Sequence, residues 1–518
     1  MRVIDFFDRG VLIHPQRAFM IDEEGTETTY IEAQVLSHRT ALAMHSVGFS
    51  QKKKAAIYSP NHPGAFNALL GIYRSGGIWV PINARNAINE NCYILNNNGA
   101  EFLFYHSEFE PHIDKIRSEC PNIKSFVCID KQGDSAPSYK TFIDGHEGVL
   151  AGFPDNPKEI CGIFSSGGTT GKPKGIVWTN DVFETMVAEW MLNMPCKQPP
   201  VHLCAAPMTH AAGVVALSMM GHGATNVIMS GVELPKLMQN IEKYNVTHLF
   251  LPPTAIYIML AHPEVRTYDY SSLEYFVYAA APMSVEKLKE AIDVFGPVMT
   301  QTYGQAEAPM ICTFFSREDH VESIESNKAH RLSSCGQQGL LTSVEIMDDD
   351  DNILQANKSG EIVVRGRLVM AGYYNDKGAT EEVTTSSGWH RTGDIGFKDE
   401  DGYIYIRDRK KDMIISGGFN IFPSEVEQVI WTHPSVQDCA VIGTPDDKWG
   451  EAVTAVVELK SGKMINESQI IDICKQELGS VKAPKAVHFW DELPRSAVGK
   501  VRKKDIRDYF WEGFDRRI

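Results

Sequence analysis

The sequence predicts an α/β fold with largely parallel sheets, a small β subdomain and a separate small domain at the C-terminus. Three observations support this class. At 518 residues the chain is too long for one hydrophobic core, so several packed units are expected. Short apolar, β-rich runs alternate with helical patterns, which is typical of parallel sheets covered by helices. From Val344 to Arg407 short strands are instead separated by Asp/Gly-rich turns, which favours a small β subdomain.

The elements of the α/β part are predicted from runs of β-branched and aromatic residues. The predicted strands are Ala55–Tyr58, Gly77–Pro81, Phe102–Tyr105, Phe126–Ile129, Thr247–Leu251 and Tyr275–Tyr278. Helices are predicted over Pro63–Ser75, where proline suits the first turn, and over Val285–Phe295. The charged segment Asp408–Asp412 then interrupts the pattern, and a compact α/β pattern follows it. We therefore expect one domain over residues 1–409 and a second over residues 410–518.

Composition excludes several classes of protein. The formal net charge of −16 argues against a general nucleic-acid binder, which would carry a basic excess. Ten cysteines without a Cys-x-x-Cys pair predict reduced thiols, and no His/Cys cluster has the spacing of a structural zinc site. The N-terminus lacks a secretory pattern, and the most apolar stretch, Leu249–Ala261, is too short for a membrane span. These features predict a cytoplasmic protein without an integral membrane segment.

The loop Ser165–Gly175 has the composition of an anion-binding cradle. Glycines let the backbone approach a ligand, hydroxyls donate hydrogen bonds, and two lysines add positive charge. The cradle residues are Ser166, Gly167, Gly168, Thr169, Thr170, Gly171, Lys172 and Lys174. The loop is not a Walker A motif, because Pro173 follows the first lysine and a strand-like run follows the loop. A flexible surface turn is the alternative interpretation.

This loop resembles the signature of the adenylate-forming superfamily, which includes acyl-CoA synthetases, firefly luciferase and peptide-synthetase adenylation domains. Further motifs follow in the order of that family: YAAAP at 278–282, TYGQAE at 302–307, TGD at 392–394, RDRKKD at 407–412 and PRSAVGK at 494–500. The resemblance implies a large N-terminal domain of two α/β subdomains plus a small β subdomain, followed by a mobile α+β C-terminal domain. The chain departs from the family at Gly167, where many members carry serine, and at Ala306, where most carry threonine.

A nucleotide site is the first implication of the resemblance. The resemblance implies that the backbone of Ala279, Ala280 and Ala281 lies beside the adenine. It also implies that the segment Thr302, Tyr303 and Gly304 contacts the nucleotide, with Tyr303 stacked on the base. Asp394 and Arg409 are implied to bind the ribose. Glu307 is implied as the magnesium ligand, and magnesium prefers such hard oxygen atoms. The hydroxyl lost at Ala306 would touch the α-phosphate, and Thr302 or Thr170 is expected to compensate for it. In isolation, the TGD segment would be read as a β-turn.

A moving C-terminal domain is the second implication. Lys411 matches the hinge about which this domain rotates after the first half-reaction. Gly417 and Gly418 then allow the pantetheine arm of coenzyme A to pass close to the backbone. Lys500 matches the lysine that bridges the substrate carboxylate and the α-phosphate, where negative charge accumulates. The implied catalytic residues are Lys500, Glu307, Thr170 and His210, the last of which borders the acyl pocket.

The implied activity is that of an ATP-dependent carboxylic acid:CoA ligase that uses ATP, Mg²⁺ and coenzyme A. The residues after His210 are apolar, and no acidic residue lies between Val201 and Ser230. This favours a fatty, aromatic or alicyclic acid over an α-amino acid. Two alternatives stay open: an acyl-AMP ligase that loads an acyl carrier protein, and a non-catalytic nucleotide or acyl sensor on the same fold. The identity of the acid and a homodimeric assembly stay open as well, whereas no nucleic-acid partner is expected.

Overall fold

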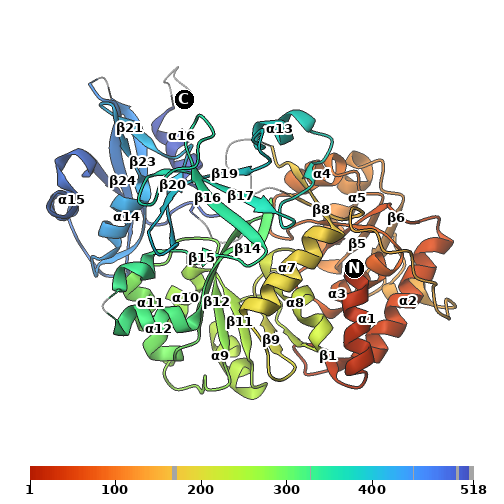
Figure 1. Ribbon diagram of the computed structural model, residues 1–518. Helices are drawn as coiled ribbons and strands as arrows, with labels where there is room; N and C mark the ends of the chain where they lie inside the picture. The colour runs from red at the N-terminus through yellow and green to blue at the C-terminus, as the bar shows by residue number, and fades with distance from the viewer. Residues whose placement is uncertain (166–171, 327, 447, 497–500, 513–518) are drawn as a thin grey trace.

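The computed structural model describes residues 1–165, 172–326, 328–446, 448–496 and 501–512. The strands of these residues form four sheets, and the arrangement follows the mixed α/β class that the sequence predicts (Figure 1). The largest buried cluster contains Trp79, from a strand of the seven-stranded sheet, and Phe19, from a strand of the nine-stranded sheet, together with residues of several helices. These two sheets and the helices between them therefore share one hydrophobic core.

The first α/β unit is a seven-stranded sheet in the order β18-β8-β7-β4-β3-β5-β6. Its strands are β3 (Lys54–Tyr58), β4 (Ile78–Pro81), β5 (Phe102–Tyr105), β6 (Ser125–Cys128), β7 (Ile160–Ser165), β8 (Gly175–Thr179) and β18 (Gly372–Tyr373). The helical segments along this part of the chain are α2 (Tyr30–Ser46), α3 (Pro63–Arg74), α4 (Ile88–Asn97), η1 (Ser107–Phe109), α5 (Glu110–Glu119) and α6 (Tyr139–Ile143). Strands β3 to β6 pair in parallel, whereas β8 is antiparallel to both of its neighbours.

The second unit is a nine-stranded sheet in the order β15-β14-β13-β12-β11-β9-β10-β1-β2. Its strands are β1 (Ala18–Ile21), β2 (Glu27–Thr29), β9 (Val201–Cys204), β10 (Thr225–Ile228), β11 (His248–Leu251), β12 (Tyr275–Tyr278), β13 (Met299–Gln305), β14 (Ala308–Phe315) and β15 (Gln337–Gln338). The accompanying helical segments are α1 (Val3–Ile13), α7 (Asn180–Asn193), α8 (Ala211–Met219), η2 (Met220–His222), α9 (Leu234–Lys243), α10 (Pro253–Leu260), α11 (Val285–Phe295), α12 (Arg317–Glu325) and η3 (Ala329–Ser333).

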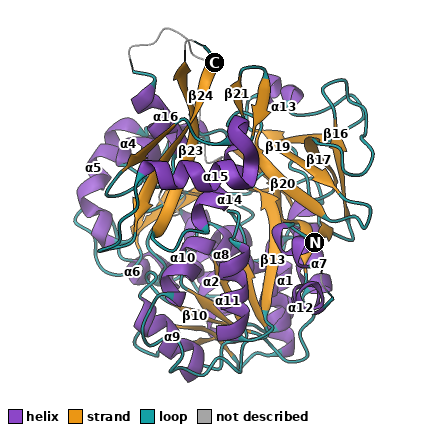
Figure 2. Ribbon diagram, turned by 90° about the vertical axis from the view of Figure 1, so that its left-hand side faces the viewer, coloured by secondary structure: helices purple, strands orange, loops and turns teal. Residues whose placement is uncertain are grey.

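The predicted β subdomain is a four-stranded antiparallel sheet in the order β16-β17-β19-β20. Its strands are β16 (Thr342–Met347), β17 (Gly360–Gly366), β19 (His390–Lys398) and β20 (Ile404–Arg409), with α13 (Lys377–Glu382) beside them in the chain. The described residues of 414–512, called the C-terminal lobe below, contain β21 (Ile414–Ser416), β22 (Phe419–Ile421), α14 (Pro423–Trp431), β23 (Val436–Asp446), β24 (Gly450–Leu459), α15 (Glu467–Lys482), β25 (Ala486–Phe489) and α16 (Lys503–Phe510). This lobe lies at one side of the molecule and follows β20 directly (Figures 1 and 2).

The predicted elements are confirmed to within one residue at each end, and the helix over Val285–Phe295 is confirmed at both ends. The predicted strand at Gly77 begins one residue later, at Ile78, because Gly77 still belongs to the end of α3. Its amide donates to the carbonyl of Ile72 at 2.9 Å, and Gly76 has a φ of +77°. This is the geometry in which glycine closes a helix, since it tolerates positive φ without steric cost.

All ten cysteines are free thiols, and nine of them are buried, in agreement with the prediction of reduced residues. Among the described residues, no helix combines the length and the apolar character that crossing a membrane requires.

A buried ion pair ties α16 to α14 inside the C-terminal lobe. Lys503 Nζ lies 2.8 Å from Glu427 Oε1, and the Val441 amide donates to the same oxygen at 2.7 Å. We predict that Glu427→Ala lowers the free energy of unfolding by about 3 kcal/mol, because it leaves a partly buried cation and a buried amide without partners. The urea midpoint of the full chain measures this, and the exposed Glu477→Ala variant is the control. Equal midpoints for the two variants would contradict the prediction.

Candidate active site

The carboxyl ends of the two large sheets face each other across a cavity of about 450 Å³. Its lining comes from the loops after β3, β4, β5, β9 and β10, and includes Ser59, Asn61, His62, Arg85, His106, Thr209 and Ser230. In each sheet the order of the parallel strands switches at this place: β3 lies between β4 and β5, and β9 lies between β10 and β11. Such switch points in the strand order are where open α/β sheets bind ligands.

Asn61 joins the two sheets at this cavity. Its amide nitrogen donates to the carbonyl oxygens of Ala206 at 2.9 Å and Met229 at 2.9 Å, and its amide oxygen accepts from the Met208 amide at 2.7 Å. The side chain is 7% exposed. Because a buried carboxamide with all these partners has little freedom, Asn61 holds the loops after β9 and β10 at a fixed distance from β3.

Three of the sequence motifs meet at Asp394. Tyr303 Oη donates to Asp394 Oδ2 at 2.6 Å, and Arg409 Nε lies 2.8 Å from Asp394 Oδ1. Asp394 and Arg409 are opposite each other in the β19–β20 pair, and Asp394 is 4% exposed. The residues proposed for the base and the ribose, which are separated by up to about a hundred positions in the chain, therefore form one contact group.

The protonation states of this group follow from its electrostatics. Burial raises the pKa of Tyr303 well above its ordinary value, and the negative charge of Asp394 adds to the effect. The same carboxylate raises the pKa of Arg409, and Glu307 contributes in the same direction. Tyr303 is thus a neutral donor and Arg409 a permanent cation beside a carboxylate. A carboxylate in this setting can accept hydrogen bonds from vicinal hydroxyls.

Glu307 is held by contacts from the β18 region. Tyr373 Oη donates to Glu307 Oε1 at 3.0 Å, and the Met370 amide donates to the Glu307 carbonyl at 2.8 Å. Lys174 Nζ lies 4.8 Å from the centroid of the Tyr373 ring. One tyrosine therefore contacts both the proposed metal ligand and a lysine of the glycine-rich loop.

The backbone near the proposed adenine site is unusually constrained. Ala280 has a φ of +77°, a conformation that costs a non-glycine residue on the order of 1 kcal/mol and that clusters at functional sites. A Cβ at Gly304 would lie 2.7 Å from the Met310 nitrogen, so glycine is required there. Ala279 and Ala281 are partly exposed, and their small side chains leave room for a flat base.

Thr302 lies away from this group. Neighbouring side chains of a strand point to opposite faces, and Thr302 is 2% exposed, whereas Tyr303 is partly exposed. Its hydroxyl has no hydrogen-bond partner among the described residues. The structure therefore brings Tyr303, but not the Thr302 hydroxyl, to the Asp394 group.

The glycine-rich loop joins an antiparallel pair, because Ser165 of β7 is in register with Gly175 of β8. This confirms the predicted transition from loop to strand, which distinguishes the loop from a Walker A motif. Lys172 Nζ lies 5.3 Å from the ring centroid of Tyr93. The other predicted cradle residues, Ser166, Gly167, Gly168, Thr169, Thr170 and Gly171, lie outside the described residues, as does Lys500.

The proposed hinge is anchored differently on its two sides. Lys410 Nζ lies 2.7 Å from Asp349 of the β16–β17 turn, whereas Asp412 Oδ1 lies 3.1 Å from Arg507 of α16. Desolvation by the surrounding residues lowers the pKa of Lys411 between them. The chain therefore passes from one anchored unit to the other at Lys411.

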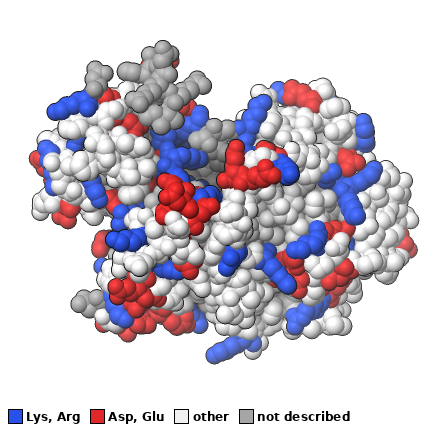
Figure 3. Space-filling view, turned by 45° about the horizontal axis from the view of Figure 1, so that its top comes forward, with Lys and Arg blue, Asp and Glu red and all other residues white. Residues whose placement is uncertain are grey.

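The glycine hairpin of the C-terminal lobe presents an apolar surface. Gly417 and Gly418 have φ values of +58° and +82°, and a Cβ at Gly417 would lie 2.5 Å from the Trp449 ring. Phe419 and Trp449 are both largely exposed for aromatic residues. Figure 3 shows Lys and Arg side chains beside the hollow between this lobe and the rest of the molecule, with Asp and Glu side chains on its rim.

His210 is exposed and directly precedes α8. The buried residues of α8 belong to apolar clusters, and the cluster that contains Val215 has a rim of partly buried side chains that includes Met208, Ala279 and Met310. Ala279 and these methionines therefore border the same apolar region, and His210 directly precedes Ala211, which lies on the same rim.

Sequence reasoning missed Tyr373, Asn61 and Glu361, whose carboxylate accepts from the Gly393 amide at 3.1 Å. None of them lies in one of the sequence motifs described above. Tyr373 offers one weak signal, since it lies in an aromatic pair directly after a glycine, and the other two give no local signal.

The chain is similar to known proteins over nearly its whole length. A family model described as AMP-binding enzyme matches residues 7–374, and a second, described as AMP-binding enzyme C-terminal domain, matches residues 425–500. A medium/long-chain-fatty-acid–CoA ligase of Mycobacterium tuberculosis is 39% identical over 497 residues, which are 92% of this chain and 84% of that protein. A feruloyl-CoA synthase of an Amycolatopsis species is 31% identical over 488 residues, 94% of each chain. The solved structure of the Bacillus subtilis o-succinylbenzoate CoA synthetase with its acyl-adenylate matches with a TM-score of 0.84 at 26% identity, over 97% of this chain and 98% of that one.

Proposed function

The chain belongs to the family of AMP-binding enzymes, and from this premise we propose that it is an ATP-dependent carboxylic acid:CoA ligase. Such an enzyme joins the acid to AMP with release of pyrophosphate, and then transfers the acyl group to the thiol of coenzyme A. The observation that carries the proposal is the contact group of Tyr303, Asp394 and Arg409, which unites three separate motifs beside Glu307.

The site residues have the chemistry that the first half-reaction requires. In our proposal Asp394 and Arg409 bind the ribose, Tyr303 stacks on adenine, and Ala279, Ala280 and Ala281 lie beside it. The glycine-rich loop from Ser166 to Lys174 holds the phosphates, and Lys500 neutralises the charge that develops between the acid and the α-phosphate. Glu307 offers hard carboxylate oxygen atoms, which suit Mg²⁺, and the ion would neutralise phosphate charge when bound.

The acid is apolar. The rim of Met208 and Met310 is partly buried among apolar residues, and methionine adapts to irregular hydrocarbon shapes. No acidic residue between Val201 and Ser230 is present to pair with an amino group. The two curated relatives described above carry the names of a fatty-acid ligase and a feruloyl ligase, and both acids are largely apolar.

We propose that the C-terminal domain begins at residue 410 and turns about Lys411 between the half-reactions. The support is the different anchoring of Lys410 and Asp412, each to its own unit. In the second state, Gly417 and Gly418 would border the path of the thiol.

A panel assay tests the function. Pyrophosphate release is measured with fatty, aromatic, alicyclic and amino acids, and the products with coenzyme A or with a phosphopantetheinylated carrier protein are identified by mass. Release with an apolar acid, followed by an acyl-CoA product, supports the proposal. An acyl-carrier product alone would replace it with the carrier-protein ligase, and no release in any class would favour the sensor.

The cavity between the sheets offers a place for the charged part of coenzyme A. The Arg85 guanidinium on its rim makes no hydrogen bond or ion pair with any residue that the structure describes. We predict that Arg85→Ala raises the KM for coenzyme A about tenfold, the effect of one charge-assisted contact with phosphate, and leaves pyrophosphate release unchanged. Arg85→Lys should retain part of the affinity because it keeps the charge. An equal loss in both half-reactions would show that Arg85 does not serve the thiol substrate.

A further inference from the structure

The turn that carries Asp394 interrupts the ladder between β17 and β19. In the β17–β19 pair, Ile395 lies opposite Glu361 and Arg391 lies opposite Val363. The three residues of β19 from 392 to 394 therefore lie opposite a single residue of β17, Ile362. Gly393 has a φ of +72°, which glycine alone adopts readily. Bulges of this kind redirect a side chain and interrupt strand pairing next to active sites. On the β17 side the position of the Asp394 turn therefore depends on contacts other than strand pairing, whereas on the β20 side Asp394 stays in register with Arg409.

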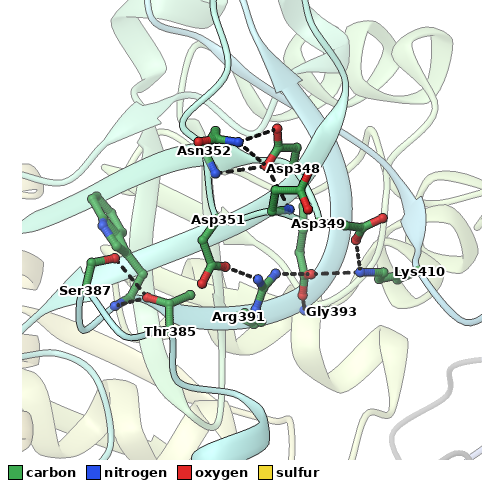
Figure 4. A network of polar contacts seen from close by, with 12 residues as sticks. Asp348, Asp349, Asp351, Asn352, Thr385, Ser387, Arg391, Gly393 and Lys410 are labelled. Carbon is green, nitrogen blue, oxygen red and sulfur yellow. Dashed lines mark hydrogen bonds and ion pairs between the residues drawn. The ribbon is translucent and has the colours of Figure 1, made fainter.

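Two side chains supply such contacts. The Thr392 hydroxyl donates to the Ile362 carbonyl at 2.7 Å and accepts from the Asp394 amide at 3.1 Å. Glu361 binds the neighbouring Gly393. Its Oε1 atom accepts from the Gly393 amide at 3.1 Å, and its Oε2 atom lies 3.0 Å from an Arg391 guanidinium nitrogen and 3.3 Å from Lys410 Nζ. Figure 4 shows Arg391, Gly393 and Lys410 gathered at this point. Glu361 is only 6% exposed, so these contacts are screened weakly by water.

The same network reaches the hinge. The Lys410 amide donates to the Gly393 carbonyl at 2.8 Å, so Gly393 and Lys410 are joined directly as well as through Glu361. On the outer side, Asp351 pairs with Arg391 and Asp349 pairs with Lys410 (Figure 4). One buried carboxylate thus contacts the turn before Asp394 and the residue before Lys411.

We propose that Glu361 is a positioning residue of the nucleotide site, which orients the Asp394 turn toward the ribose and anchors the chain at the start of the hinge. Glu361 touches neither ATP nor the acid in this assignment and acts through Gly393 and Lys410. The proposal rests on the proposed function, because it takes Asp394 as the partner of the ribose hydroxyls.

The preference of the enzyme for ATP over 2′-deoxy-ATP tests the proposal, because 2′-deoxy-ATP lacks one of the ribose hydroxyls that Asp394 would bind. A preference is a ratio of two rates, so it does not change when part of the enzyme is inactive. The ratio of kcat/KM for the two nucleotides is measured by pyrophosphate release. Glu361→Ala is expected to reduce the ratio about tenfold, the effect of losing one well-placed hydrogen bond to a charged group. Glu361→Gln keeps an oxygen acceptor for the Gly393 amide and should restore most of the ratio.

Two further variants complete the design. Asp349→Asn removes a neighbouring carboxylate that contacts Lys410 but not Gly393, and it should keep the wild-type ratio. Glu361→Asp keeps the charge but moves the acceptor away from the Gly393 amide by one methylene, so it should lower the ratio. This variant keeps the proposal testable if the alanine variant does not fold. Wild-type ratios in the folded alanine and aspartate variants would overturn the proposal. Failure of the proposed function would look different, because the wild-type enzyme would then release no pyrophosphate at all.

Discussion

Replacing Lys500 with alanine is expected to abolish adenylate formation while largely sparing the transfer of a supplied acyl-AMP to coenzyme A. The ammonium group neutralises negative charge only while the acid attacks the α-phosphate, and removing one such stabilising group lowers the rate by about 10² to 10³-fold. Pyrophosphate release measures the first step. The mass of acyl-CoA formed from synthetic acyl-AMP measures the second.

Lys504 provides the matched control for this variant. It lies four positions further along, on α16, where it pairs with Asp508 at 2.6 Å and is largely exposed. Lys504→Ala should therefore retain both activities. If Lys500→Ala lost both half-reactions to the same extent, the lysine would not have the role that we assign to it.

Glu307→Gln is expected to lower kcat/KM for Mg²⁺-ATP about 100-fold and to shift the Mg²⁺ dependence to higher concentration. The glutamine can still accept the hydrogen bond of Tyr373, so the fold is retained, but it lacks the negative charge that attracts a hard cation. Pyrophosphate release at fixed ATP and increasing Mg²⁺ measures both effects. In the wild-type enzyme, removing the metal with a chelator should abolish the release.

Glu381 serves as the control carboxylate. It is exposed on α13 and pairs with Lys377 of the same helix at 3.4 Å, close in sequence to the Tyr373 strand. Glu381→Gln should leave the Mg²⁺ dependence unchanged. A Glu307→Gln enzyme with the Mg²⁺ dependence of the wild type would remove Glu307 from the metal site.

Elements with a strong local signal could be read from the sequence. The helix Val285–Phe295 and the strands Phe102–Tyr105 and Tyr275–Tyr278 are confirmed without change, because each is an uninterrupted run with one period. The end of α3 was predicted one residue too late, at Ser75 instead of Arg74. Gly76 and Gly77 follow the last turn of α3 and form its C-terminal cap, so the next strand begins only at Ile78.

Site residues within contiguous motifs were predictable in a similar way. Tyr303, Asp394 and Arg409 were identified from short segments, and the structure brings these three together. Glu361 was not identified, because its partners Gly393 and Lys410 lie 32 and 49 positions away in the chain. No periodicity or composition in the segment around Glu361 indicates which turn its carboxylate will reach.

The sequence by itself determined what is local: the periods that specify helices and strands, the glycines that allow positive φ, and the types of charged group available for phosphate, metal and ribose. Only the tertiary structure decided which of these groups meet. The physical reason is that strand pairing sets the register between distant segments, as in the β19–β20 pair that places Asp394 opposite Arg409 and the β7–β8 pair that closes the glycine-rich loop. A shift of one residue in either register would turn these side chains to the opposite face of their sheet, so the site exists only in the folded arrangement.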